Sequence, residues 1–86
     1  MKSYMVLCDF EGNSYSGEID VKGGISLYGD EGTYLYGDIG NEGSIALYDE
    51  DNNFISGDVD KNGKVSLFDN AGNPWYGEIK LSQNKL

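Results

Sequence analysis

Residues 45–64 read IALYDEDNNFISGDVDKNGK, and this 20-residue unit decides the fold because the chain carries four copies of it. The copies occupy residues 5–24, 25–44, 45–64 and 65–84 and align without a gap. Leu47 has a leucine at the equivalent position of every copy, and Gly57 has a glycine at the equivalent position of every copy. Self-similarity at a fixed period indicates one repeated supersecondary unit. We therefore interpret residues 1–86 as a single repeat domain.

Each copy carries two turn signals about ten residues apart. The first is Asp-x-x-Gly, as in Asp69 to Gly72, and the second is represented by Asp60 to Gly63. Aspartate at the first position of a type I turn accepts hydrogen bonds from the backbone ahead, and glycine at the fourth takes the left-handed conformation. Asn52 replaces that glycine in the third copy, and asparagine tolerates this conformation well. The pattern predicts three-residue hairpin loops closed by a bulge.

These turns fix a register that places all odd-numbered strand residues on one face. If Asp49 pairs with Asn53, then Leu47 faces Ile55 and Ile45 faces Gly57, and side chains alternate between faces along each strand. The odd-numbered face is apolar almost throughout. Its members are Met5, Leu7, Tyr15, Gly17, Ile19, Ile25, Leu27, Leu35, Gly37, Ile39, Ile45, Leu47, Ile55, Gly57, Val59, Val65, Leu67, Trp75, Gly77 and Ile79.

The predicted fold is all-β: four tandem β-hairpins forming an eight-stranded antiparallel meander with pseudo-four-fold symmetry. Glycines such as Gly57 on the apolar face indicate a crowded, curved interior, since glycine otherwise weakens a strand. A flat sheet would leave the apolar face in water. We therefore expect the sheet to be closed or barrel-like, with a closed barrel and a splayed flower both compatible with the pattern.

The repeated pattern G-[DE]-[IV]-x-x-x-G-x-[IV]-x-L-[YF]-D-x-x-G resembles the four-fold β-flower domain of bacterial proteins. The resemblance covers nearly the whole chain and implies four hairpins about a pseudo-four-fold axis, without implying an activity. The segments Tyr15 to Ile19 and Trp75 to Ile79 are similar, more weakly, to MORN repeats.

Composition excludes several function classes. The net charge of −9 disfavours direct binding to nucleic acid or to an anionic membrane and favours a basic partner. The chain has no histidine, so neither Cys8 nor a serine has the usual activating base. We expect no enzymatic activity and no cofactor. A lone cysteine and the lack of a signal-peptide pattern predict a cytoplasmic protein.

The even-numbered face carries an aromatic group in the second and third copies. The register pairs Tyr28 with Tyr34, Tyr36 with Tyr48, and Tyr48 with Phe54. The equivalent positions of the first copy hold Cys8, Ser14 and Ser16. Aromatic pairs across strands stabilise a sheet, and aromatic residues beside acidic ones are also typical of protein interfaces. Tyr28, Tyr34, Tyr36, Tyr48 and Phe54 are therefore the candidate partner-binding residues.

Two groups of carboxylates are candidates for binding a cation. Asp58, Asp60, Asn62 and Asp69 match the ligand spacing of a calcium loop, although the same stretch also fits a hairpin turn without flanking helices. The symmetric set Glu18, Asp38, Asp58 and Glu78 could surround an axis, but its even numbering predicts an outward orientation. We assign no metal site from the sequence.

Three functions remain open from the sequence. The first is a non-catalytic protein-interaction module, in one variant an acidic inhibitor that mimics nucleic acid and blocks a basic protein. The second is a small-ligand or calcium-binding domain. The third is a structural domain that forms homo-oligomers.

Overall fold

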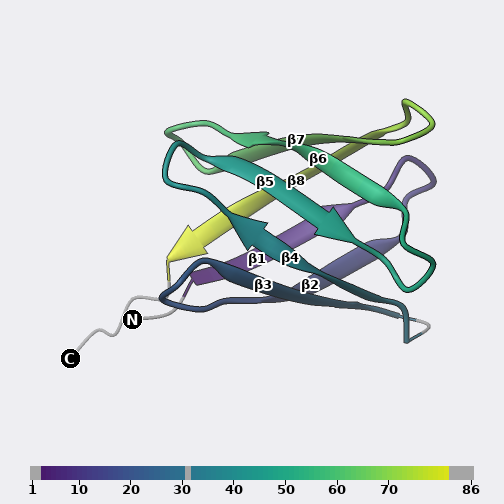
Figure 1. The fold of residues 1–86 in the computed structure, drawn as a ribbon, viewed down its shortest axis with the longest axis horizontal. Coiled ribbons are helices and arrows are strands. Elements are labelled where there is room, and N and C mark those ends of the chain that lie inside the picture. The colour runs from purple at the N-terminus through teal and green to yellow at the C-terminus, as the bar shows by residue number, and fades with distance from the viewer. Residues whose placement is uncertain (1–2, 31, 82–86) are drawn as a thin grey trace.

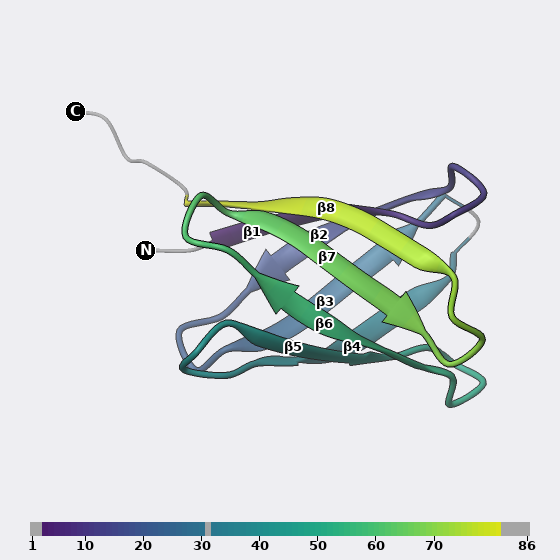
Figure 2. The same ribbon diagram turned by 90° about the horizontal axis from the view of Figure 1, so that it is seen from above.

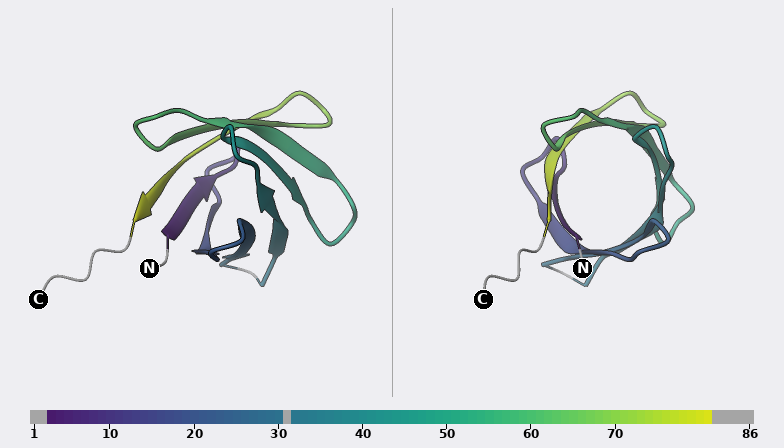
Figure 3. Two further views of the ribbon diagram at one scale, coloured as in Figure 1. Left: turned by 60° about the vertical axis from the view of Figure 1, so that its left-hand side comes forward. Right: turned by 90° about the vertical axis from the view of Figure 1, so that its left-hand side faces the viewer.

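The computed structural model describes residues 3–30 and 32–81, and these form a closed barrel of eight antiparallel strands (Figure 1). Each strand pairs with its neighbours in sequence, and β8 pairs with β1 to complete the ring that is seen end-on in Figure 3. No helix occurs among the described residues. The strands are β1 Ser3–Cys8, β2 Ser14–Ile19, β3 Gly24–Gly29, β4 Tyr34–Ile39, β5 Ser44–Tyr48, β6 Phe54–Val59, β7 Lys64–Asp69 and β8 Pro74–Leu81.

The Asp/Gly turns set the register as predicted. At the β5–β6 turn the Asn52 amide donates to the carbonyl of Asp49 at 3.1 Å, and Asn52 takes a φ of 66°. The Asp49 carboxylate accepts from the amides of Asp51 and Asn53 at 2.8 and 2.9 Å. Leu47 consequently faces Ile55 across the hairpin, which confirms the pairing deduced from the turn.

The odd-numbered face lines the inside of the barrel. Eight strands enclose an interior that side chains can fill, so the barrel has a packed core rather than a channel. Ile39, Val59 and Ile79 pack against this core while partly buried. The buried residues are Met5, Leu7, Tyr15, Ile19, Ile25, Leu27, Leu35, Ile45, Leu47, Ile55, Val65, Leu67 and Trp75.

The inward glycines mark places where two strands approach too closely for a side chain. A Cβ atom on Gly37 would overlap the carbonyl oxygen of Ala46 on β5, and it would lie 2.9 Å from the Cα of Leu47. Gly17, Gly57 and Gly77 meet the next strand in the same way. The obstacle is therefore the backbone of the neighbouring strand rather than the core side chains alone. Glycine at these corners lets the sheet curve enough to close.

Closure repeats the contact that already joins consecutive hairpins. Gly77 of β8 pairs with Leu7 of β1, as Gly17 of β2 pairs with Leu27 of β3. The fourth junction is thus equivalent to the other three, and the chain forms a closed barrel rather than a splayed flower. In Figure 2 the strands run obliquely to the long axis, as closure of a barrel requires.

The described part of the chain contains no helix with the length and apolar character needed to cross a membrane.

Candidate functional site

Five aromatic rings contact one another in sequence along the outside of β3, β4, β5 and β6. The ring centroids are separated by 4.9 Å between Tyr28 and Tyr34 and by 5.6 Å between Tyr34 and Tyr36. They are separated by 5.9 Å between Tyr36 and Tyr48 and by 5.2 Å between Tyr48 and Phe54. We refer to Tyr28, Tyr34, Tyr36, Tyr48 and Phe54 as the aromatic ladder. The three pairings predicted from the sequence are present, since each pair lies opposite in the register.

The rings of the aromatic ladder remain accessible while in mutual contact. Tyr28 is 59% exposed, and Tyr36, Tyr48 and Phe54 are each about two-fifths exposed. The contact between Tyr34 and Tyr36 was not predicted, because it joins residues two apart on β4. That contact joins the pair Tyr28 and Tyr34 to the group Tyr36, Tyr48 and Phe54, so the five rings form one continuous row.

The aromatic ladder is absent from the hairpin of β1 and β2. At the equivalent outer positions the Cys8 sulfur lies 3.9 Å from the Ser14 hydroxyl, and Ser16 faces Tyr28 across the junction. Phe68 and Tyr76 are further outward aromatic residues, 55% and 61% exposed, that the sequence reasoning left out. Their positions are repeat equivalents of Tyr28 and Tyr36, and that equivalence is the signal by which they could have been found.

One end of the barrel is strongly acidic. The turns β1–β2, β3–β4, β5–β6 and β7–β8 lie together at the right of Figure 1. Their described residues, 9–12, 29–30, 32, 49–52 and 69–72, hold seven of the 15 acidic residues and none of the six lysines. We refer to this as the acidic end. The lysines in the described residues, Lys22, Lys61, Lys64 and Lys80, lie in or beside the turns of the opposite end.

Tyr15 and Trp75 close the core at the acidic end. Their rings stack with centroids 5.4 Å apart, and each is only 8% exposed. The Tyr15 hydroxyl donates to the carboxylate of Asp9 at 3.1 Å, and the Trp75 indole N–H donates to that of Asp69 at 3.2 Å. Ile55 stands at the equivalent position of the third copy and has no polar atom for Asp49.

Hydrogen bonding controls the ionisation of these turn carboxylates. Burial raises the pKa of Asp9, but bonds from Asn13, the Glu11 amide and Tyr15 outweigh it, and the pKa lies below its ordinary value. The pKa of Asp49 is lowered in the same way, burial again opposing the bonds from Asn53 and other amides. Burial, followed by the hydrogen bond to Asp9, raises the pKa of Tyr15 to about 12. The carboxylates are therefore charged and the Tyr15 hydroxyl is protonated at neutral pH.

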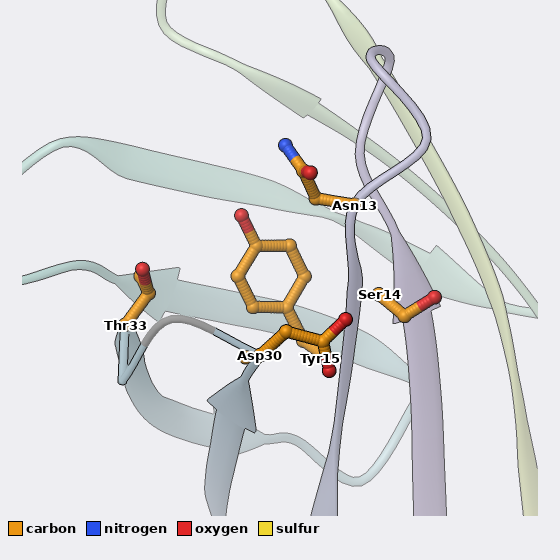
Figure 4. Close-up of a pocket in the computed structure, with 6 residues that line it drawn as sticks. Asn13, Ser14, Tyr15, Asp30 and Thr33 are labelled. Carbon is orange, nitrogen blue, oxygen red and sulfur yellow. The ribbon is translucent and has the colours of Figure 1, made fainter.

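A pocket of about 120 Å³ opens beside Tyr15 at the acidic end (Figure 4). It lies where the second copy departs from the Asp-x-x-Gly pattern, with Gly29 at the position of the capping aspartate. A Cβ atom on Gly29 would lie 2.9 Å from the Tyr15 ring, so the ring itself occupies that space. Asn13, Ser14, Asp30 and Thr33 complete the pocket walls.

The symmetric carboxylates point outward, as their even numbering predicted. Glu18, Asp38, Asp58 and Glu78 are all exposed and lie one on each even-numbered strand. Glu78 lies 4.0 Å from the Lys64 ammonium and 3.8 Å from that of Lys80. Exposed pairs at such distances contribute little to stability. The four carboxylates therefore do not converge on the barrel axis.

The calcium-loop alternative needs correction, because its residues do not belong to one loop. Asp60 lies in the β6–β7 turn, whereas Asp69 ends β7 at the other end of the barrel. The Asp60 carboxylate already accepts from the amides of Asn62 and Lys64 at 2.8 and 3.0 Å, and Asp58 lies on β6. Asp58 and Asp60 therefore lie near one end of β7, and Asp69 lies at its other end. Across residues 3–30 and 32–81, no group of three or more His, Cys, Asp or Glu side chains is arranged to hold a metal ion.

Searches with family models, against curated proteins and against solved structures gave no match to this chain. The function is therefore to be inferred from the geometry of the barrel surface.

Proposed function

We propose that the aromatic ladder and the adjoining acidic end form a docking surface for a basic segment of a partner protein, without catalysis. The observation that carries this proposal is the row of five rings in continuous contact, of which Tyr28, Tyr36, Tyr48 and Phe54 are exposed and Tyr34 is partly buried. Such a row is more than the fold needs, because the β1–β2 hairpin forms with Ser14 and Ser16 at equivalent positions.

The closed barrel favours recognition by side chains. A partner strand can add to a sheet only where an edge strand is unpaired. Each of the eight strands here is paired with a strand on both sides, so the sheet has no edge strand to which a partner strand could bind. A partner must therefore lie across the outside of the barrel, where the aromatic ladder presents a continuous row of rings.

Charge determines the chemistry of the proposed partner. Asp30 follows the end of β3, two residues after Tyr28, and Asp49, Glu50 and Asp51 lie between Tyr48 and Phe54. A lysine or arginine side chain over these rings gains a cation–π contact of about 0.5–1 kcal/mol at an exposed site. The neighbouring carboxylates attract the same cation, and they repel phosphate groups.

The test measures binding of a fluorescein-labelled peptide of alternating arginine and glycine by fluorescence anisotropy. We expect the double variant Tyr34→Ser with Tyr36→Ser to weaken binding about tenfold, because two cation–π contacts together are worth roughly 1–2 kcal/mol. These substitutions introduce the serines that Ser14 and Ser16 supply in the first copy, and they leave the net charge unchanged.

The matched control is Tyr76→Ser, which removes a 61% exposed ring on β8 outside the aromatic ladder. It should bind the peptide as the unaltered protein does. Equal affinity of the control and the double variant would reject the aromatic ladder as the docking surface. A peptide of alternating glutamate and glycine should show no binding, and binding by it would reject the charge argument.

Two further outcomes address the alternatives. Affinity that falls steeply with added salt favours the inhibitor that mimics nucleic acid, whereas affinity independent of salt removes that variant. Sedimentation equilibrium tests self-association. An oligomer of the unaltered protein that Tyr48→Ser dissociates would assign the aromatic ladder to a second copy of this chain instead of a basic partner.

A further inference from the structure

We infer that a groove across β2 and β3, at the Tyr28 end of the aromatic ladder, receives one guanidinium or ammonium side chain of the docked segment. This inference rests on the proposed function and specifies the partner further. The basic segment places one cationic side chain beside Tyr28, the last ring of the aromatic ladder on β3.

The groove combines an aromatic wall with two carboxylates. Its volume is about 450 Å³, which exceeds what a single arginine or lysine side chain fills. Tyr28 forms one wall with a ring that is 59% exposed, and Ser26 faces Glu18 across the two strands. Asp20 lies further along, at the turn that joins β2 to β3. The lining residues are Gly17, Glu18, Asp20, Gly24, Ser26 and Tyr28.

The turn holds the Asp20 carboxylate in position before any ligand arrives. Its Oδ1 atom accepts from the amides of Lys22 and Gly24 at 2.9 and 2.8 Å. A guanidinium ion forms strong, directional hydrogen bonds with carboxylates and also stacks on aromatic faces. Asp20 thus offers carboxylate hydrogen bonds at the turn end of the groove, and Tyr28 offers an aromatic face at the other end of β3.

Gly24 is the residue that keeps the groove open. The equivalent residue in the third copy is Lys64, whose ammonium reaches Glu78 across its own hairpin. A lysine at position 24 would bring a cation and a long chain into the space beside Asp20. The glycine is not required by backbone conformation, because Lys64 occupies the same turn position with the same amide bond to Asp60.

The other junctions between copies lack this combination of residues. The second junction has Gly40 in place of the aspartate and Ala46 in place of the serine. The third has both carboxylates, at Asp58 and Asp60, but has Lys64 in place of the glycine. A feature imposed by the repeat would recur at each junction, so this combination of side chains is not a requirement of the repeat.

The experiment titrates n-butylguanidinium chloride into the 15N-labelled protein and follows backbone amide shifts by NMR. We expect saturable shifts centred on Gly24, Ser26 and Tyr28, and none with the neutral isostere n-butylurea at the same ionic strength. Equal shifts with both compounds, or shifts that spread over the acidic end without saturating, would overturn the inference.

Two variants locate the site. Glu18→Gln with Asp20→Asn removes both charges, while the asparagine oxygen can still cap the turn, and it should weaken binding of n-butylguanidinium about tenfold. Gly24→Lys should abolish binding without unfolding the chain, as judged by an otherwise unchanged spectrum. The matched control, Asp58→Asn with Asp60→Asn, removes the same charges from the third junction and should bind normally. A control as weak as the first double variant would show that only net charge matters.

The outcome separates this inference from the proposed function. If n-butylguanidinium fails to bind in the groove while the arginine–glycine peptide still requires Tyr34 and Tyr36, the groove is wrong and the docking surface stands. If n-butylguanidinium binds as described and the peptide does not bind, the groove is a site for a small cation and the docking surface is wrong.

Discussion

The substitution Gly37→Ala tests the close approach of strands on which barrel closure depends. The added Cβ atom would overlap the Ala46 carbonyl oxygen and would lie 2.9 Å from the carbonyl carbon of Ala46 and from the Cα of Leu47. All three are backbone atoms of β5, so no side-chain rotation relieves the contact. The two strands must separate, and their pairing at this corner must weaken.

The expected loss is large relative to the stability of so small a domain. Overpacking a core with one extra carbon costs about 1–3 kcal/mol, and a rigid backbone obstacle places Gly37→Ala near the upper value. A domain of 86 residues is stabilised by roughly 4–13 kcal/mol in total. Gly37→Ala should therefore remove a substantial part of the free energy of unfolding.

Urea denaturation followed by the fluorescence of Trp75 measures this loss. Trp75 is the only tryptophan and stacks on Tyr15, so unfolding changes its surroundings. With an m-value of about 1 kcal/mol/M, the denaturation midpoint should fall by about 2–3 M. The control is Gly40→Ala, where the added Cβ meets nothing nearer than the Ser44 carbonyl oxygen at 3.9 Å. Equal midpoints for the two variants would refute the close approach of β4 and β5.

Three further predictions concern the turns and the acidic end. Gly40→Asp should raise the melting temperature by about 5 °C. The Asp60 carboxylate accepts two backbone amide bonds at the equivalent turn, and a hydrogen bond contributes about 1 kcal/mol to stability. Thermal denaturation measures the change, and a lower melting temperature would contradict the equivalence of the turns. Stability should fall as the pH drops from about 4 toward 2. Folding lowers the pKa values of Asp9 and Asp49 from 3.8, so the stability that these carboxylates contribute is present above that pH and is lost when they are protonated. Urea denaturation midpoints at pH 6 and 3 measure the loss, and Asp49→Asn should reduce the difference between them. Stability should also fall as the pH rises from 10 through 12, because folding raises the pKa of Tyr15 from 10.0 to about 12; Tyr15→Phe should be less sensitive over this interval, as urea midpoints at pH 9 and 11 would show.

The sequence was sufficient to predict the strands, their register and the buried face. The reason is physical: an aspartate such as Asp49 ties its own turn together, and a two-residue side-chain period then transmits that register along the strands. Neither step requires information from distant parts of the chain. The predicted pairing of Leu47 with Ile55 is correct for this reason.

Features that depend on three-dimensional curvature could not be predicted in this way. The choice between a barrel and a splayed flower depends on how far the sheet bends at each junction between copies. The alternation of apolar and polar residues along a strand does not indicate this bend. The same limit hid the stacking of Tyr15 on Trp75, which come from opposite halves of the sequence. The groove beside Tyr28 was also missed, since its walls become adjacent only when β2 and β3 are placed in space.

The symmetry of the barrel separates what the fold requires from what it does not. A requirement of the fold must be met at all four corners, as Gly17, Gly37, Gly57 and Gly77 meet it. The outward carboxylate next to each of these glycines also recurs four times, so Glu18 by itself does not distinguish the first junction from the others. The aromatic ladder spans only the second and third copies, and the combination of Asp20, Gly24 and Ser26 that lines the groove beside Tyr28 is found at the first junction and not at the second or third. Selection for stability alone acts on every copy alike, so residues that break the repeat without strengthening its turns or core are where a binding function is to be sought.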